Sequence, residues 1–424
     1  MDTHIGSSPS TVLRQLQTME GILPEFQTLC ESQLKSTTRE SVVAMDETFF
    51  GQFLILVLMD LRSGYLILEN VATNRCFDTW FTHVEPRLKS LGIQVNHAVT
   101  DRAKALIKLA ITGFKCESGA DLFHAQQDVM RWLGATLGRR LSRAEKQQAT
   151  AANPEDSAQA EQNVESIKAS KLQYHENLQG LSEDLRPFSL LNNQAQTEDG
   201  LLDTLEKRVR CFEAIAQKQA IPDNNEAAKK LRNQIAPLAV NVTAWWLWVN
   251  ETLQALKVDA ILQKWIVEIL LPVVYWHYQL HKTQNTLLRE KYRQAWESSS
   301  EVLRQHPLTY ALLAYKLQHW LTWAEWMVQH FHRSSSAVEG RNGSLSKMYH
   351  NGRGISESRL KALTVIHNYG LKRQDGTTAA QRFFAQDFPD LFSWVLGQMG
   401  ELPLPRQGRS KVVLDPLKLL GVPA

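Results

Sequence analysis

The sequence predicts an α/β protein in which a mixed five-stranded sheet, flanked by helices, is split by a large all-helical insertion. Three observations support this fold class. β-branched and aromatic residues are concentrated in residues 41–70, as is typical of strands. From there to residue 137, strand-like segments alternate with amphipathic helical ones. Between residues 141 and 331 the strand signals stop, and residues that favour helices follow at helical spacing.

The composition fits a protein of several domains without membrane spans. The chain has 424 residues and a formal net charge of +3, which is too small to identify a partner by itself. The cysteines are scattered and form no CxxC pair, so we expect neither a zinc site nor disulfides but reduced thiols in a cytoplasmic protein. The most apolar stretch, residues 258–278, is interrupted by charges at Asp259, Lys264 and Glu268, so we expect a buried helix and no membrane contact.

Residues 1–40 are predicted to form a short N-terminal helical segment. Ser10 and Thr11 precede a helical pattern and are suited to cap it. Pro24 is expected to end this helix, and a second short helix is expected from Glu25 to about Leu34. The segment is too short to be a complete DNA-reading domain followed by a linker.

Residues 41–137 are predicted to form the first part of an α/β core. Strands are expected at residues 41–50, 53–59, 65–68 and 93–100, with a fifth strand or strand end at Asp121–His124. Helices are expected at residues 77–91, 103–109 and 126–137, and Gly92 is suited to end the first of them. Short turns make the first three strands antiparallel, whereas strands reached through helices should run parallel to the first. Ligands are then expected at the carboxyl ends of the parallel strands.

Residues 138–333 are predicted to be an all-helical insertion, and residues 334–384 to complete the core. Asn153 and Pro154 should separate two helices within the insertion. Its tryptophans occur at helical spacing, which favours a packed core, although such rings can also stack on unpaired bases. In residues 334–384 helices are expected at 337–349 and 356–367, joined by a basic loop at 350–354. Residues 385–424 are expected to be a tail that lies on the surface.

Three acidic residues form the candidate catalytic site. Asp46 lies on the predicted first strand between apolar neighbours, and Asp101 follows the predicted fourth strand. Two buried carboxylates on adjacent strands repel each other, and a hard divalent cation removes this repulsion. The third candidate is Glu339, in the first turn of a helix rich in small residues. Each acid also has a structural interpretation: Asp46 as a turn residue, Asp101 as a helix cap, and Glu339 as a first-turn acid stabilised by the helix dipole.

Other acids near these positions fit the site less well. Glu325 lies among tryptophans, and Glu357 begins a later helix. Glu47 should point to the opposite face of the sheet from Asp46, so we expect it to face solvent or to support the site from outside.

A cation-rich stretch follows Glu339 and is suited to contact phosphates. The candidate DNA-binding residues, which could equally lie in a solvated surface, are Arg341, Asn342, Lys347, His350, Arg353 and Lys361. His124 is a candidate to orient a carboxylate or to contact the reacting phosphate, and a purely structural histidine is the alternative.

These residues resemble the DDE transposases of insertion-sequence type, which have an RNase H-like catalytic core. The resemblance rests on Met45–Thr48, Val99–Arg102, Ala337–Asn342, Asp121–His124 and Asp375–Phe384. It implies metal-dependent DNA cleavage and strand transfer at transposon ends, with two Mg²⁺ or Mn²⁺ ions held by Asp46, Asp101 and Glu339. It also implies transposon-end and target DNA as partners, and a homodimer or higher oligomer on DNA. Some members carry a helical domain between the second Asp and the Glu, as this chain is predicted to do.

One departure from the family pattern leaves alternatives open. Such transposases usually have an N-terminal helix-turn-helix that reads the element ends, whereas only residues 1–40 precede the first predicted strand. End recognition would then lie in the helical insertion, or the chain would be truncated. The alternatives are an RNase H-like nuclease without strand transfer, and a non-catalytic DNA-binding or assembly protein derived from a transposase.

Overall fold

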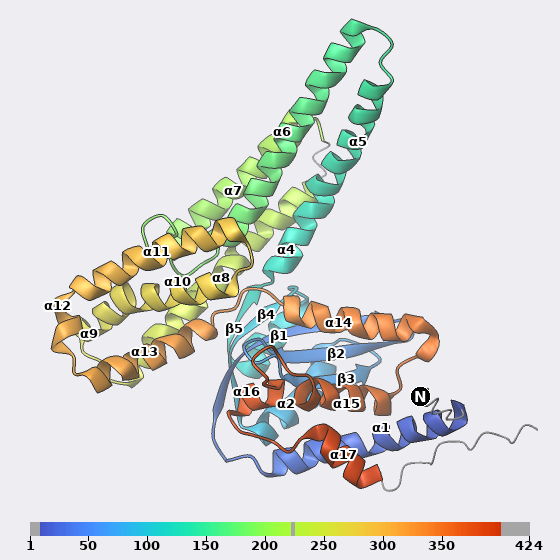
Figure 1. Cartoon of the computed structure of the whole chain (residues 1–424), viewed down its shortest axis with the longest axis vertical. Helices are drawn as coiled ribbons and strands as arrows, with labels where there is room; N and C mark the ends of the chain where they lie inside the picture. Colours follow the sequence, from blue (N-terminus) through green and yellow to red (C-terminus); the bar gives the residue numbers. More distant parts are fainter. Residues whose placement is uncertain (1–8, 222–224, 400–424) are drawn as a thin grey trace, which may run out of the picture.

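A sheet with helices on both faces and a long helical region beside it make up the protein (Figure 1). The computed structural model describes residues 9–221 and 225–399. The sheet has five strands in the order β3-β2-β1-β4-β5. Their bounds are β1 (Arg39–Phe50), β2 (Phe53–Asp60), β3 (Leu66–Ala72), β4 (Ile93–Thr100) and β5 (Glu117–Ala120).

The strand directions follow from the connections. Tight turns join β1, β2 and β3, and both pairs are antiparallel. The connection from β3 to β4 passes through helix α2 (Phe77–Leu91), and β4 pairs with β1 in parallel. β5 is in turn parallel to β4. These pairings confirm the predicted mixed five-stranded sheet flanked by helices, and they place the first strand next to the fourth.

The fifth strand is displaced from its predicted position. The sequence suggested a strand or strand end at Asp121–His124, but β5 comprises Glu117–Ala120 and α4 (Leu122–Val129) begins immediately after Asp121. The reason is a helix cap, because the Asp121 carboxylate accepts a hydrogen bond from the backbone N–H of Phe123 at 2.9 Å. The prediction of a strand end at Asp121–His124 is therefore wrong, and His124 lies in the first turn of a helix.

Alternation along β1 separates two apolar layers. Val42 and Ala44 face the layer that also contains Val338 and Leu345 of α14 (Ser336–Met348) and much of the helical region. Val43 belongs to the opposite layer, which packs against α1 (Pro9–Ser32), α2 and the helices near the C-terminal end of the described residues. Since side chains alternate along a strand, Asp46 shares the first face and Glu47 the second.

The N-terminal segment is one helix. α1 (Pro9–Ser32) contains Pro24 in its interior, so the predicted break at this proline is wrong. Leu23 and Phe26, on either side of Pro24, are both buried in the same apolar layer. Burial of both halves against one surface holds the helix together where the proline removes a backbone donor. The short helix after β4 is α3 (Lys104–Lys108), which continues as a π-helical segment, η1 (Leu109–Phe114).

The region between β5 and the Glu339 helix consists mainly of helices. Two of them, α5 and α6, extend far from the sheet (Figure 1) and are separated at Asn153, as the sequence predicted. Trp245, Trp265 and Trp276 are buried. Within the described residues, no helix combines the length and the apolar character that crossing a membrane requires. After α4 the elements are η2 (Met130–Gly134), α5 (Ala135–Ala149), α6 (Pro154–Asp184), α7 (Glu198–Lys218), α8 (Asn225–Ala255), α9 (Ala260–Trp265), η3 (Ile266–Leu270), α10 (Leu271–Lys282), α11 (Thr286–Gln305), α12 (Pro307–Ala311) and α13 (Ala314–Gln329).

The chain then returns to the sheet. The predicted loop at residues 350–354 is largely a π-helical continuation of α14, and residues 400–424 of the predicted tail lie outside the described part. The side chain of Asn368 pairs with the backbone of Leu66 at the start of the edge strand β3. It accepts from Leu66 N at 2.9 Å and donates to Leu66 O at 3.0 Å. The elements are α14 (Ser336–Met348), η4 (Tyr349–Arg353), α15 (Glu357–Val365), η5 (Ile366–Gly370), α16 (Ala379–Phe384) and α17 (Leu391–Met399).

Candidate functional site

Three carboxylates converge where the pairing of β1 with β4 ends. The last paired residues are Met45 and Thr100, so Asp46 and Glu47 continue β1 beside Asp101, which has left β4. Asp46, Glu47 and Asp101 each place one oxygen within 4.8 Å of the others. The two aspartates predicted from the sequence are thus neighbours at the carboxyl ends of parallel strands.

Helix α14 brings further polar groups to Asp46. Asp46 is only 9% exposed. One of its oxygens accepts from the Glu47 backbone N–H at 2.8 Å, and the other accepts from Asn342 Nδ2 at 2.7 Å. Glu339 lies one helical turn before Asn342 on the same side of α14. Its carboxylate is close enough to Asp46 to raise the pKa of that acid. Glu339 therefore lies beside Asp46, but outside the group formed by Asp46, Glu47 and Asp101.

His124 links Glu339 to a buried aspartate. Its Nε2 lies 3.4 Å from Glu339 Oε1, and its Nδ1 lies 2.7 Å from Asp121 Oδ2. The hydrogen bond to Asp121 is the main cause that raises the pKa of His124 to about 9, and the charges of Glu339 and Asp46 act in the same direction. At neutral pH the imidazole is therefore a cation between carboxylates.

Asp121 also fixes the start of α14. It is 2% exposed and accepts from the Ser335 backbone N–H at 3.0 Å and from the Ser335 hydroxyl. Beside it, the Leu122 N–H donates to Arg333 O at 3.0 Å. These bonds join residues more than 200 positions apart, since Asp121 and Ser335 are separated by 214. These contacts place Glu339 beside the sheet, although the helical region separates it from the strands in the sequence.

The electrostatics of the cluster favour a bound cation. Burial is the first cause and the Glu339 charge the second cause that together raise the pKa of Asp46 to about 8. Burial also raises the pKa of Glu47, although the Trp80 indole N–H donates to it at 3.1 Å. Asn342 Oδ1 is buried without a hydrogen-bond partner among the described residues. Carboxylate and amide oxygens are the ligands that Mg²⁺ and Mn²⁺ prefer, so the donor set fits these ions.

Glu47 belongs to the acidic cluster, although the sequence analysis expected it to face solvent or to support the site from outside. Alternation does direct it to the face opposite Asp46, where it meets Trp80 of α2. It is nevertheless 8% exposed and does not face solvent. Because β4 no longer covers the edge of β1 at this point, the side chains on both faces can approach Asp101. An acid next to Asp46 within an apolar strand is the signal that could have identified it.

The predicted DNA-binding residues occupy different environments. Arg341 and Asn342 are each 8% exposed. Arg341 forms two bonds of 2.7 Å with the Glu69 carboxylate, and Asn342 contacts Asp46, so both differ from the predicted surface role because their polar groups are engaged inside the protein. Lys347, His350 and Lys361 are exposed, and Lys361 pairs with Glu357 at 2.8 Å. The side chain of Arg353 lies outside the described part.

The buried Arg341–Glu69 pair should contribute strongly to the stability of the fold. Thr364 Oγ1 donates to the same carboxylate at 2.6 Å, so a Glu69→Gln change leaves a buried guanidinium without its counter-ion. We expect the free energy of unfolding to fall by about 3 kcal/mol, measured by urea denaturation. The matched control is Glu357→Gln, which breaks the exposed pair with Lys361 and should change the midpoint little. Equal effects of the two changes would contradict this assignment.

The family match covers only the part of this site that α14 contributes. Residues 266–411 are similar to a family described as Family of unknown function (DUF6399). This range includes Glu339 and Asn342 but neither Asp46 nor Asp101. No curated protein matches the chain.

Proposed function

We propose that this protein is a metal-dependent DNA strand transferase of the DDE transposase type, with an RNase H-like catalytic core. The observation that supports this most is the grouping of Asp46, Glu47 and Asp101 at one edge of the sheet, with Glu339 near enough to raise the pKa of Asp46. Their elements, the first strand, the end of the fourth strand and a later helix, are those that the sequence resemblance implies. The adjacency of β1 and β4 supports it further.

The residues of the site divide into ligands and supports. Asp46, Asp101 and Glu339 would hold two Mg²⁺ or Mn²⁺ ions, and Glu47 and Asn342 offer further oxygens. Bound ions supply activation of water or a DNA 3′-hydroxyl and stabilisation of the leaving oxygen. His124 adds positive charge next to Glu339, where a phosphate would approach, while Asp121 keeps its imidazole oriented.

A joining assay tests the proposal. Purified protein is incubated with labelled DNA carrying a free 3′-hydroxyl end, with a target plasmid and with either Mg²⁺, Mn²⁺ or EDTA. We expect nicked and joined products with either metal and none with EDTA. Nicking without joining would favour the nuclease without strand transfer. The absence of both, in a folded protein that binds DNA, would favour the non-catalytic binding protein and overturn the proposal.

We prefer an enzyme to a protein that only binds DNA, because the buried acidic cluster destabilises the metal-free fold. Asp46 is held near Glu339 although its burial and the Glu339 charge both disfavour its charged form. A protein that only binds DNA gains nothing from buried acids that repel phosphates. We further propose that the protein works in the cytoplasm and as a homodimer or higher oligomer on DNA.

A further inference from the structure

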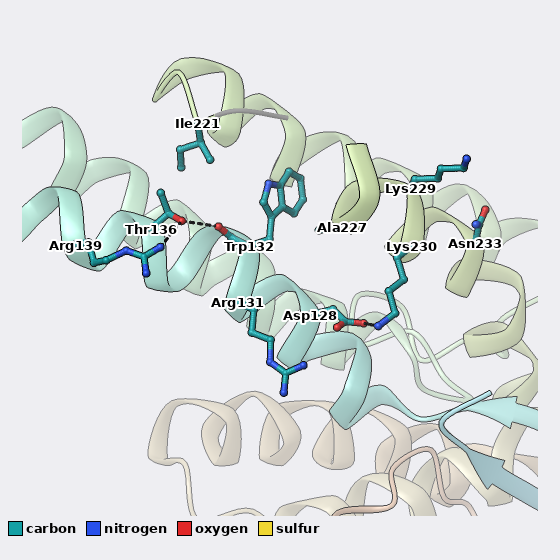
Figure 2. Close-up of a pocket in the computed structure, with 10 residues that line it drawn as sticks. All are labelled: Asp128, Arg131, Trp132, Thr136, Arg139, Ile221, Ala227, Lys229, Lys230 and Asn233. Atoms are coloured by element: carbon teal, nitrogen blue, oxygen red, sulfur yellow. Dashed lines mark hydrogen bonds and ion pairs between the residues drawn. The ribbon is translucent and has the colours of Figure 1, made fainter. Parts of the chain in front are cut away.

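A basic groove lies beside the helix that carries His124. Its walls are η2 and α5 on one side and the beginning of α8 on the other, and it encloses about 760 Å³ (Figure 2). Of the described side chains that line it, four are basic and one is acidic. The basic ones are Arg131, Arg139, Lys229 and Lys230, and the acidic one is Asp128.

Among the described residues, Lys230 is the member of this group that pairs with a carboxylate. Asp128 pairs with Lys230 at 2.7 Å. Arg131 donates to the neutral Gln127 side chain at 3.2 Å, and Arg139 to the Thr136 hydroxyl at 3.4 Å. The indole of Trp132, which is 7% exposed, gives the groove an apolar wall between these cations. A groove whose described lining carries four exposed cations and one acid is suited to a ligand with repeated negative charges.

One wall of the groove continues the helix that carries His124. His124 and Asp128 are four residues apart on α4, and Arg131 and Arg139 follow on the continuation of this helix (Figure 2). At 1.5 Å per residue, Arg131 lies roughly 10 Å and Arg139 roughly 22 Å from His124 along the axis. One strand of B-DNA carries a phosphate about every 3.4 Å of its axis. On a DNA strand that runs along this helix, the two arginines would meet the backbone about three and seven nucleotides from His124.

We propose that this groove binds the phosphate backbone of the DNA that flanks the bond acted on, an inference that rests on the proposed function. Arg131, Arg139 and Lys229 contact phosphates at separate points along this backbone. Recognition is electrostatic, since the residues assigned here are cations that contact phosphates, and phosphate contacts carry no sequence information.

The test measures binding separately from chemistry. The triple variant Arg131→Gln, Arg139→Gln, Lys229→Gln is titrated onto a short fluorescein-labelled DNA duplex of mixed sequence between about 50 and 200 mM salt. We expect at least a tenfold loss of affinity and a plot of log K against log[salt] that is less steep by about 3. Lysine at positions 131 and 139 should restore most of the affinity. The matched control neutralises three exposed cations elsewhere, Lys257, Lys291 and Lys316, and should retain the wild-type slope.

Each outcome has a distinct meaning. Unchanged affinity and slope in the triple variant would overturn the inference, as would tighter binding of an RNA duplex of the same sequence. If the triple variant loses binding while an Asp46→Asn variant still cuts DNA, the groove assignment stands and the proposed function fails. If Asp46→Asn is inactive and the triple variant binds normally, the groove assignment alone fails. Circular dichroism melts confirm that each variant is folded.

Discussion

Replacement of Asp46 by Asn should abolish metal-dependent DNA cleavage and joining while the fold persists. Asp46 has contacts with both halves of the site, through the Glu47 N–H and through Asn342 of α14. An amide of the same shape keeps the packing but removes the charge that a divalent cation requires. We expect a rate reduction of roughly 1,000-fold or more in a nicking assay with Mg²⁺. Glu117→Gln, which removes an exposed acid from the same sheet, is the control and should leave the rate unchanged.

The same substitution should stabilise the metal-free protein. The pKa of Asp46 is raised from 3.8 to about 8, so its carboxylate disfavours the folded state at pH values above 3.8, increasingly so up to about pH 8. Removal of the charge should raise the free energy of unfolding at pH 7 by roughly 2 kcal/mol, with little effect near pH 4. Urea denaturation in EDTA at several pH values measures this. A variant that is less stable at pH 7 than the wild type would show that the carboxylate is structurally favourable, and would contradict the repulsion inferred between Asp46 and Glu339.

Replacement of Asp121 by Ala should have the largest effect on stability. Its buried carboxylate accepts from Phe123 N, from His124 and twice from Ser335. The change leaves these donors without a partner, and we expect a loss of about 3–5 kcal/mol. Ser335→Ala removes one donor and should cost about 1 kcal/mol. Ser336→Ala, at the exposed next position, is the control and should be neutral.

The variant Asp121→Asn distinguishes the role of Asp121 in holding His124 protonated beside Glu339 from its role in the stability of the fold. The amide can still accept from the backbone but no longer carries the charge that holds the imidazole protonated. We expect the pKa of His124 to fall from about 9 toward 6.5, followed by NMR titration and assigned with His124→Gln. DNA cleavage should fall even where the protein is fully folded, because Glu339 loses its cationic neighbour. A folded Asp121→Asn variant with an unchanged His124 pKa and full activity would contradict the positioning role.

The Asp121–His124 pair also sets a pH window. The pKa of Asp121 is lowered in the fold by its hydrogen bonds, despite its burial, so its contribution is present above 3.8 and is lost as the pH falls below that value. The pKa of His124 is raised, so its contribution is complete below 6.5 and is lost as the pH rises through about 9. Both contributions are complete only between about pH 3.8 and pH 6.5, so the link between α4 and α14 is strongest in that range.

Local signals were sufficient for the first four strands and for most helices. Apolar alternation, the Asp60–Gly64 turn and Gly92 at the end of α2 lie within the segments that they shape, which is why the order and direction of the strands could be predicted. The two aspartates followed from that topology, since adjacent parallel strands end at the same edge. Asp121 shows the limit of such reasoning. Its apolar neighbours Leu122 and Phe123 suggest a strand, whereas its role as a helix cap is set by geometry.

Long-range partners were invisible in the sequence. Arg341 lies in a basic stretch that suggests a DNA contact, but its counter-ion Glu69 is 272 residues away on β3. The same holds for the bond between Ser335 and Asp121, which determines where Glu339 lies. Pro24 was misjudged because the burial of Leu23 and Phe26 in one apolar layer outweighs a local helix-breaking preference. The prediction failed where a contact across the chain outweighs a local pattern.

The most direct measurement is the anomalous diffraction of crystals of the wild-type protein soaked with Mn²⁺. We predict Mn²⁺ peaks enclosed by the carboxylates of Asp46, Asp101 and Glu339, at about 2.1 Å from their oxygens, and their loss in Asp46→Asn. Three ordered carboxylates that remain without a peak at saturating Mn²⁺, or that lie too far apart to share the ions, would contradict a shared metal site.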